Sequence, residues 1–314
     1  MFSILIASYN PVWKKLKVTI DSVLKQDYRD FEIVVTDDGS ENNLFPEIEE
    51  YMKAQQFENY KLVAHEKNQG TVKNLIDGVK ACSGKYVRDF GPGDAFYNEK
   101  SLGRLYQFME DNQAEACFGL MRGYCVSEAG DITYTNFLHP FDIEAYKKQD
   151  IKRIEKNLIL YRDNASGACT SYTREYYLEY LEKLVGTVVY TEDIFQLMAG
   201  IDGRPMQLYP DYLIWYEADT GVSTKKRSPF QEKLALDVDN FYAMLQEKYP
   251  ENQNVKAQKR VSGLYKIRNL YVRTLIRFFV NPDAIRYLVS HWIQTKKGSY
   301  LPKNSDEGFL KEII

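Results

Sequence analysis

The first hundred residues alternate short apolar runs with amphipathic helical patterns, and this alternation constrains the fold more than any other feature of the chain. Apolar runs at residues 2–7, 31–36, 60–64 and 86–90 predict strands. The segments between them repeat apolar residues every three or four positions, as helices do. Strands that alternate with helices form parallel sheets. We therefore predict an α/β fold, with a Rossmann-like, mainly parallel sheet flanked by helices.

Three of these predicted strands run directly into polar or glycine-rich loops. The loops consist of Ala7, Ser8, Tyr9 and Asn10; Asp37, Asp38, Gly39 and Ser40; and Gly91, Pro92, Gly93 and Asp94. In open α/β sheets, ligands bind in the crevice outside the carboxyl ends of the strands. We expect the three loops to converge there and to form the functional site.

The pattern changes after about residue 226. From there the chain becomes continuously helical, with helices expected at residues 231–248, 255–280 and 284–294, after an earlier helix at 142–160. We therefore predict two regions: an α/β domain over residues 1–226 that carries the site, and a helical C-terminal region over residues 227–314.

Composition narrows the chemistry. A net charge of −3 over 314 residues excludes a global basic field, so we expect no nucleic-acid partner. The four cysteines form no CxxC pair and there are only three histidines, so acid/base or metal-binding groups must be carboxylates. The chain starts without a basic, apolar leader and has no run of about 18 apolar residues. We expect a cytoplasmic protein, either free or peripheral at the inner face of the membrane.

Several short motifs occur in a fixed order along the α/β region. They are the loop at residues 7–10, Val34-Val-Thr-Asp-Asp-Gly-Ser40, Asn68-Gln-Gly70, and Gly84-Lys-Tyr86 leading into Gly91-Pro-Gly-Asp94. In this order and spacing they resemble the N-terminal half of family-2 inverting glycosyltransferases with the GT-A fold, of the bacterial polysaccharide and cell-wall type. The resemblance covers about residues 1–225.

This resemblance implies a nucleotide-sugar site. The base would lie against Tyr9, and a carboxylate of Asp37 or Asp38 would accept its ring N–H. The alternative for the two aspartates is a turn that caps the next helix. Lys73 would approach the diphosphate, or else lie on a solvated helix face. The full set of expected nucleotide-sugar contacts is Ala7, Ser8, Tyr9, Asn10, Asp37, Asp38, Lys73 and Gly93.

The metal motif departs from the family pattern. Many relatives carry an Asp-x-Asp-Asp run that holds Mn²⁺ or Mg²⁺ on the diphosphate, whereas here only Asp94 remains. Where relatives have a metal-binding histidine, this chain has Trp215-Tyr-Glu-Ala-Asp219, so Asp219, or Glu217, is the second expected metal ligand. The alternatives are a tight turn at Asp94 and a strand-end turn at Asp219.

The resemblance also implies the catalytic groups. Thr191-Glu192-Asp193 matches the family's Glu-Asp pair, whose aspartate is the general base, so we expect Asp193 in that role with Glu192 as the substitute. The alternative is helix capping by Thr191 and its acidic neighbours. Gly167-Ala-Cys169 resembles the segment that shapes the sugar pocket, with Ser166 and Arg174 as weaker candidates.

The predicted function is transfer of a sugar from a nucleotide-diphosphate donor, a UDP-sugar, to a hydroxyl of a glycan, polymer or lipid-linked acceptor. Two alternatives stay open: a degenerate nucleotide-sugar-binding or scaffold protein, and a nucleotidyltransferase. The Arg- and aromatic-rich C-terminal helices either lie in a membrane interface, beside a lipid-linked acceptor, or pack as a bundle on the catalytic domain.

Overall fold

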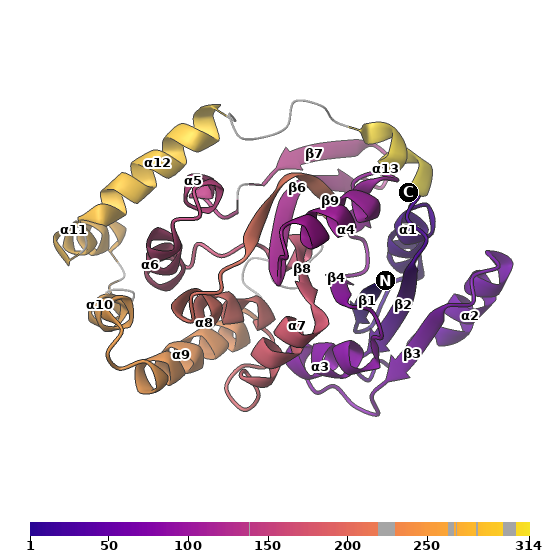
Figure 1. The fold of residues 1–314 in the computed structure, drawn as a ribbon, viewed down its shortest axis with the longest axis horizontal. Helices are drawn as coiled ribbons and strands as arrows, with labels where there is room; N and C mark the ends of the chain where they lie inside the picture. Colours follow the sequence, from indigo (N-terminus) through magenta and orange to yellow (C-terminus); the bar gives the residue numbers. More distant parts are fainter. Residues whose placement is uncertain (138, 219–229, 263–266, 268, 281, 298–305) are drawn as a thin grey trace.

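A nine-stranded sheet in the strand order β3-β2-β1-β4-β8-β6-β9-β5, with β7 paired to β6, forms the centre of the molecule (Figure 1). The computed structural model describes residues 1–137, 139–218, 230–262, 267, 269–280, 282–297 and 306–314. The strands are β1 (Phe2–Ser8), β2 (Phe31–Asp37), β3 (Tyr60–Ala64), β4 (Tyr86–Phe90), β5 (Ala95–Phe96), β6 (Ala116–Val126), β7 (Ile132–Asn136), β8 (Thr170–Thr173) and β9 (Gln207–Glu217).

The first four strands of the chain are all parallel, as the alternating pattern predicts. Beyond β4 the sheet is mixed, because β8 runs antiparallel to both β4 and β6, whereas β6 and β9 are parallel to each other. Helices cover the sheet, so the predicted α/β architecture is confirmed. β1 and β2 are almost completely buried, which explains why their sequences are continuous apolar runs and not alternating ones.

Helices connect and cover the strands, and the predicted helices of the first hundred residues are confirmed within a few residues. Their bounds are α1 (Trp13–Leu24), α2 (Phe45–Ala54), α3 (Thr71–Ala81), α4 (Ser101–Asp111), α5 (Ile143–Lys147), α6 (Ile151–Tyr161), η1 (Gly167–Cys169), α7 (Arg174–Glu182), η2 (Glu192–Phe195), α8 (Gln196–Ile201), α9 (Phe230–Lys248), α10 (Gln253–Ser262), α11 (Leu270–Val280), α12 (Asp283–Lys297) and α13 (Glu307–Ile313).

Two helix predictions are wrong in their continuity. The segment 142–160 is divided into α5 and α6, because Gln149 takes a left-handed backbone conformation and Asp150 starts a new helix by accepting a hydrogen bond from the Arg153 N–H. The segment 255–280 is likewise divided into α10 and α11. Apolar spacing alone did not reveal either break, since each pair of helices continues a similar periodicity.

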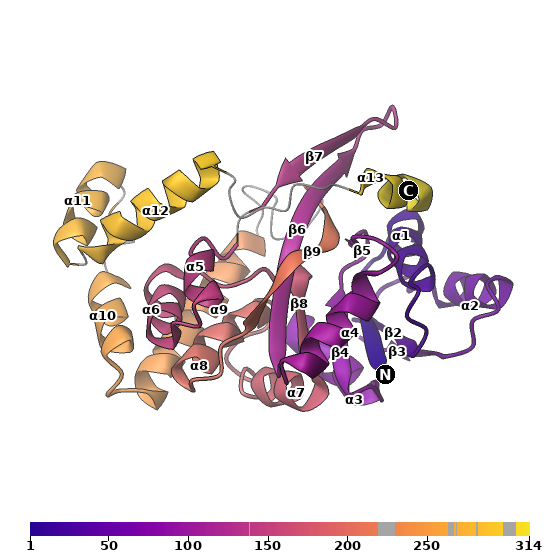
Figure 2. The same cartoon turned by 45° about the horizontal axis from the view of Figure 1, so that its top comes forward.

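The C-terminal helices reach both ends of the molecule. α11 and α12 lie beyond α5 and α6, far from β1 to β3, whereas α13 returns to lie beside α1 (Figures 1 and 2). Phe309, Leu310 and Ile313 of α13 are buried. No helix in the described part of the chain combines the length and hydropathy that crossing a bilayer requires.

Candidate active site

The loop after β2 is built by Asp37, the last residue of that strand. Its carboxylate accepts hydrogen bonds from the Ser40 N–H at 2.8 Å, from the Ser40 hydroxyl at 2.5 Å and from the Ser8 hydroxyl at 3.3 Å. Ser40 Oγ in turn accepts a hydrogen bond from the Asn10 N–H at 2.6 Å. The first two expected loops therefore meet, and Asp37 forms a turn but does not cap the next helix, α2, whose N-cap residue is Leu44.

Asp38 holds a third loop, which precedes α3. Its Oδ1 accepts the Gln69 N–H at 2.8 Å and lies 3.0 Å from His65 Nδ1, and its Oδ2 accepts the Gly70 N–H at 2.8 Å. Gly70 has a positive φ of 94°, and an added Cβ would lie 2.2 Å from Val189 Cγ1, so only glycine fits. Both carboxylate oxygens of Asp38 thus support this loop, and the Asp38 backbone N–H donates to the Ser8 carbonyl at 3.0 Å.

Above these fixed loops, the side chains of Tyr9 and Asn10 are exposed at the end of β1. Tyr9 is 55% exposed, so part of its side chain is accessible to a ligand. Lys73 is exposed on the first turn of α3, the helix that Asp38 anchors through Gly70. The predicted nucleotide contacts thus fall into two groups. Asp37 and Asp38 are buried and support the loops, whereas Tyr9, Asn10 and Lys73 have exposed side chains.

The loop at residues 91–94 brings Asp94 to the same edge of the sheet. Thr19 Oγ1 accepts the Gly93 N–H at 2.9 Å, and Tyr124 donates to the Gly93 carbonyl at 2.6 Å. Gly93 has a φ of 107°, and an added Cβ would lie 2.2 Å from Glu217 Oε2. The loop is therefore fixed from both sides, and Gly93 serves the backbone turn.

The Asp94 carboxyl is buried and poorly supplied with donors. Its Oδ1 accepts one hydrogen bond, from the Glu217 N–H at 3.0 Å. Burial, together with the nearby carboxylates of Glu217 and Asp89, raises the pKa of Asp94 to about 7. Lys15 pairs with Glu217 at 2.9 Å, which partly offsets the local negative charge.

Among the described residues, no three His, Cys, Asp or Glu side chains gather closely enough to hold a metal ion by themselves. Asp94 places one carboxyl group at the loop, and a single carboxylate would suit a cation whose other ligands are phosphate oxygens and water. Asp219, the other expected metal ligand, lies outside the residues that the structure describes.

Glu192 and Asp193 form the first turn of η2, and both side chains are half-buried. Burial raises the pKa of both carboxyls, and their mutual repulsion raises that of Glu192 further. Opposing these effects, the Arg162 charge and a 2.9 Å hydrogen bond from Asn164 Nδ2 lower the pKa of Asp193. Glu192 and Asp193 are thus two neighbouring, half-buried carboxyl groups that accept few hydrogen bonds.

The segment expected to shape the sugar pocket lies directly against this pair. A Cβ on Gly167 would lie 3.1 Å from Glu192 Oε1 and 3.7 Å from Asp193 Cβ. Thr191 precedes η2, but its side chain makes no capping hydrogen bond, and Thr191 Oγ1 has no partner among the described residues. The capping alternative for this motif is therefore wrong as far as Thr191 is concerned.

Two neighbouring residues on β4 complete the site, and the sequence analysis missed both. Arg88 is fully buried and donates to the Thr170 carbonyl at 2.9 Å and to the Ala168 carbonyl. Asp89 accepts a hydrogen bond from the Tyr177 hydroxyl at 3.3 Å, and burial raises the pKa of Asp89 to about 6. Two charged residues inside a five-residue apolar strand were the signal that could have revealed them.

The structure thus places Asp89 in electrostatic range of Asp94 on one side and of Glu192 and Asp193 on the other. Arg88 is the buried cation among them, lowering the pKa of both Asp89 and Asp94. It also fastens β4 to the segment that carries Gly167. Glu192 and Asp193 have few donors and raised pKa values, so either carboxyl can accept a proton.

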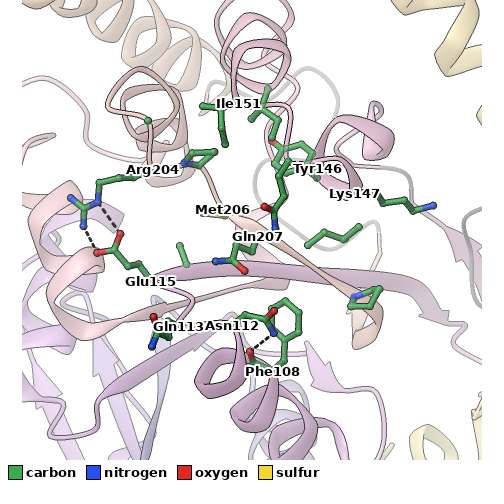
Figure 3. A pocket seen from close by; sticks show the side chains of 17 residues that line it. Phe108, Asn112, Gln113, Glu115, Tyr146, Lys147, Ile151, Arg204, Met206 and Gln207 are labelled. Atoms are coloured by element: carbon green, nitrogen blue, oxygen red, sulfur yellow. Dashed lines mark hydrogen bonds and ion pairs between the residues drawn. The ribbon is translucent and has the colours of Figure 1, made fainter.

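A separate cavity of about 470 Å³ lies at the opposite edge of the sheet, where β6 and β9 begin (Figure 3). Its rim includes the Glu115–Arg204 ion pair at 2.7 Å and the amide of Asn112, which donates to the Phe108 carbonyl at 2.8 Å. None of the expected site residues lines it. This cavity is therefore distinct from the candidate active site, which consists of the loops at the carboxyl ends of β1, β2 and β4 and of the Glu192–Asp193 pair.

Comparison with known families agrees with this geometry. The family described as Glycosyl transferase family 2 matches residues 3–181, more than half of the chain, including the loops after β1, β2 and β4. The chain belongs to glycosyl transferase family 2. The resemblance found in the sequence is confirmed.

Individual relatives in this family match only part of their length. GlyG of Streptococcus pneumoniae serotype 4 is 27% identical over 137 residues, which is 43% of this chain and 43% of GlyG. An uncharacterized glycosyltransferase of Methanocaldococcus jannaschii is 28% identical over 156 residues, which is 49% of this chain and 50% of that protein. The chain therefore spans half or less of the length of both curated relatives.

Among solved structures, S. aureus TarS 1–349 in complex with UDP-GlcNAc is similar with a TM-score of 0.50 and 20% sequence identity. The match covers 76% of this chain and 66% of that one. The likeness supports the GT-A-like fold, with a mostly parallel sheet flanked by helices.

Proposed function

We propose that this chain is an inverting glycosyltransferase that moves a sugar from a nucleotide-diphosphate donor to a hydroxyl group of a glycan, polymer or lipid-linked acceptor. The observation that carries this proposal is the Glu192–Asp193 pair beside Gly167, at the same edge of the sheet as Asp94 and the nucleotide loops. Family membership supports the reaction class. The UDP-GlcNAc bound to TarS supports a UDP-sugar as the donor.

In this proposal Asp193 is the general base and Glu192 its substitute. As the acceptor oxygen bonds to the anomeric carbon, the bond from that carbon to the diphosphate breaks, and the acceptor proton passes to the Asp193 carboxylate. A raised pKa suits this role, because a base that titrates closer to neutral pH has more driving force for taking a proton. Asn164 orients the carboxylate through its 2.9 Å hydrogen bond.

The leaving diphosphate needs positive charge. Lys73, exposed on the first turn of α3, is the proposed cation of this chain, and the α3 N-terminus adds a favourable dipole. A Mn²⁺ or Mg²⁺ ion, when bound, would be held by Asp94 together with the donor's phosphate oxygens and would neutralise the leaving group. Tyr9 would pack against the base, with Ala7, Ser8 and Asn10 forming the floor around it.

Thermal unfolding with UDP, dTDP, GDP and CDP, each with and without Mn²⁺, tests the donor class. A ligand at about 100 times its dissociation constant stabilises by roughly 2.7 kcal/mol, which is easily measured. We expect the largest shift with UDP plus Mn²⁺, and release of UDP from a UDP-sugar when an acceptor is present. Absence of a shift with every nucleotide would contradict the proposal.

One observation favours a second candidate, a nucleotide-sugar-binding protein without catalysis. The loop at residues 91–94 retains a single carboxylate, and the described residues contain no cluster of metal-binding groups. This candidate predicts a nucleotide shift that is indifferent to Mn²⁺, and no turnover with any acceptor. The same thermal experiment, followed by an assay for released UDP, separates the two functions.

We further propose that residues 1–226 form the catalytic domain and that the helical region, residues 227–314, brings it to an anionic membrane surface. In support, α11 exposes Tyr271, Leu275 and Phe279 at intervals of four, and α12 exposes Val289 and Trp292. Tyr271 is 85% exposed and Trp292 is 61% exposed, beside the exposed cations Arg286 and Lys296.

Co-sedimentation with phosphatidylglycerol vesicles tests this contact. We expect binding that is lost in the double variant Phe279→Asp, Trp292→Asp but kept in Leu236→Asp, a control at an exposed leucine of α9. Equal binding by all three proteins, or by none, would contradict the proposed contact.

A further inference from the structure

A buried carboxylate on α9 contacts the segment that leads into the catalytic pair. Asp237 is only 4% exposed. It accepts hydrogen bonds from three successive backbone N–H groups: Val189 at 3.1 Å, Tyr190 at 2.6 Å and Thr191 at 3.0 Å. The next two residues are Glu192 and Asp193. α9 therefore binds the chain immediately before the proposed base.

The burial of Asp237 sets it apart on its own helix. The other acidic residues of α9, Glu232, Asp239 and Glu247, are all exposed. A buried carboxylate is costly unless several donors satisfy it, and three charge-assisted hydrogen bonds do so here. Tyr190 also packs edge-to-face on Phe230, with ring centroids 4.9 Å apart. The contact is therefore a specific, multiply bonded junction between α9 and residues 189–191.

The opposite side of the same segment contacts Gly70, in the loop before α3, and Val72, at the start of α3. The Val189 carbonyl accepts the Val72 N–H at 3.0 Å, and the Val189 side chain fills the space beside Gly70. Gly70 is itself held by Asp38. Residues 189–191 are thus clamped between α9 and the loop that precedes α3, with Glu192 and Asp193 leaving the clamp toward Gly167.

We propose that Asp237 is a positioning residue for the catalytic pair. By fixing three successive N–H groups it sets where η2 begins, and hence where the carboxylates of Glu192 and Asp193 face the sugar-binding segment. This inference rests on the proposed function for its catalytic consequence, whereas the support of residues 189–191 by Asp237 stands on its own. It also assigns a role in the active site to a helix from the C-terminal region.

The test compares Asp237→Asn with Asp239→Asn, an exposed aspartate two residues along the same helix. Asparagine keeps the volume of Asp237 but replaces one acceptor oxygen by an NH₂ group, which faces the donors of the segment unfavourably. We expect kcat to fall at least tenfold in Asp237→Asn, with the donor KM and the UDP-induced thermal shift unchanged within twofold. Asp239→Asn should match the wild type.

Amide hydrogen exchange supplies a readout that does not depend on activity. In Asp237→Asn the amides of Val189, Tyr190 and Thr191 should exchange at least tenfold faster, while those of β1 and β2 keep their protection. Asp237→Glu retains the negative charge and should have a kcat between those of the wild type and Asp237→Asn. It also tests the contact if the asparagine variant does not fold.

The outcomes separate this inference from the proposed function. If the wild type transfers sugar and Asp237→Asn has the same kcat, the positioning role is overturned. It is also overturned if the kcat of Asp237→Glu is equal to or lower than that of Asp237→Asn. Unchanged exchange at residues 189–191 would overturn the support itself. If the wild type transfers no sugar, the proposed function fails, and the exchange experiment still decides whether Asp237 holds the segment.

Discussion

Two groups of carboxylates lie at the same edge of the sheet, and the protein treats them in opposite ways. Asp37 and Asp38, after β2, each accept several hydrogen bonds from the loops around them. Asp89 and Asp94, on and after β4, accept few, and burial raises the pKa of Asp89 to about 6 and that of Asp94 to about 7. Asp193, in η2, is similarly short of donors, and its pKa is also raised.

The number of hydrogen bonds that a carboxylate accepts thus distinguishes residues that stabilise the loops from residues that are able to interact with a substrate. A carboxylate that accepts several hydrogen bonds within the folded chain stabilises a loop and has fewer acceptor sites left for a ligand. A carboxylate that is buried with few donors keeps its demand for a proton or a cation, and it can meet that demand with substrate. In the structure the Asp37-Asp38 motif supports the loops, whereas Asp89, Asp94 and Asp193 accept few hydrogen bonds.

The largest effect that would sharpen this comparison is on the rate. Asp193→Asn removes the proposed proton acceptor while keeping the side-chain volume, so we expect kcat to fall by about 10²–10⁴-fold. Donor binding, measured as the UDP-induced thermal shift, should persist. Glu182→Gln, at an exposed residue paired with Lys80, serves as the control. Retained turnover in Asp193→Asn would move the role of base to Glu192.

The next largest effect is expected on stability, at the carboxylates that support the loops. Asp38→Ala leaves the buried Gly70 N–H and the Gln69 N–H without their acceptor, so we expect the free energy of unfolding to fall by about 2–4 kcal/mol. Urea denaturation measures the change. Glu41→Ala, an exposed acid on the same loop, should change stability by less than about 0.5 kcal/mol. Equal losses in both variants would break the comparison.

The opposite sign is expected for Asp94→Asn. The native state keeps the Asp94 proton to a pKa of about 7, whereas the unfolded state releases it near the ordinary value of 3.8. The contribution of Asp94 to the free energy of unfolding therefore falls as the pH rises from about 4 to about 7 and is level above that. Each unit of pKa difference corresponds to about 1.4 kcal/mol, so a difference of about three units sets an upper limit of about 4 kcal/mol on the gain of the variant at pH 8, with no gain near pH 4.

Urea unfolding at pH 4, 6 and 8 measures this gain, and the same variant should lose the Mn²⁺-dependent part of the UDP thermal shift. Stabilisation combined with weaker metal-assisted binding is the behaviour of a residue kept for a ligand and not for the fold. A destabilisation at pH 8 comparable to that of Asp38→Ala would place Asp94 among the loop builders instead.

Local patterns accounted for most of the fold. The strands β1 to β4 and the helices between them follow from apolar spacing and from the turn residues that separate them, both of which are properties of neighbouring residues. The two wrong helix predictions have a local cause as well. Over residues 142–160 and 255–280, the apolar periodicity continues on both sides of the point where one helix ends and the next begins. Only the left-handed Gln149 and the cap at Asp150 reveal the first of these breaks.

For the candidate site, the sequence predicted which loops take part but not the contacts that their side chains make. The motifs placed Tyr9, Asp38, Asp94 and Asp193 at the ends of their elements, because strand ends and helix starts are readable from sequence. They could not show that Asp38 would bind Gln69 and Gly70, more than 30 residues away. The role of an acidic residue depends on such donors, so the motif alone left construction and chemistry undecided.

The sequence by itself determined the order of elements, the edge of the sheet where the site lies and the family to which the chain belongs. Tertiary structure alone decided which carboxylates are satisfied, that Arg88 binds carbonyl groups about 80 residues later, and that Asp237 holds a segment 46 to 48 residues earlier. The physical reason is range. Periodicity and turn chemistry act between neighbours, whereas burial and hydrogen-bond partnership arise only when distant segments are packed together.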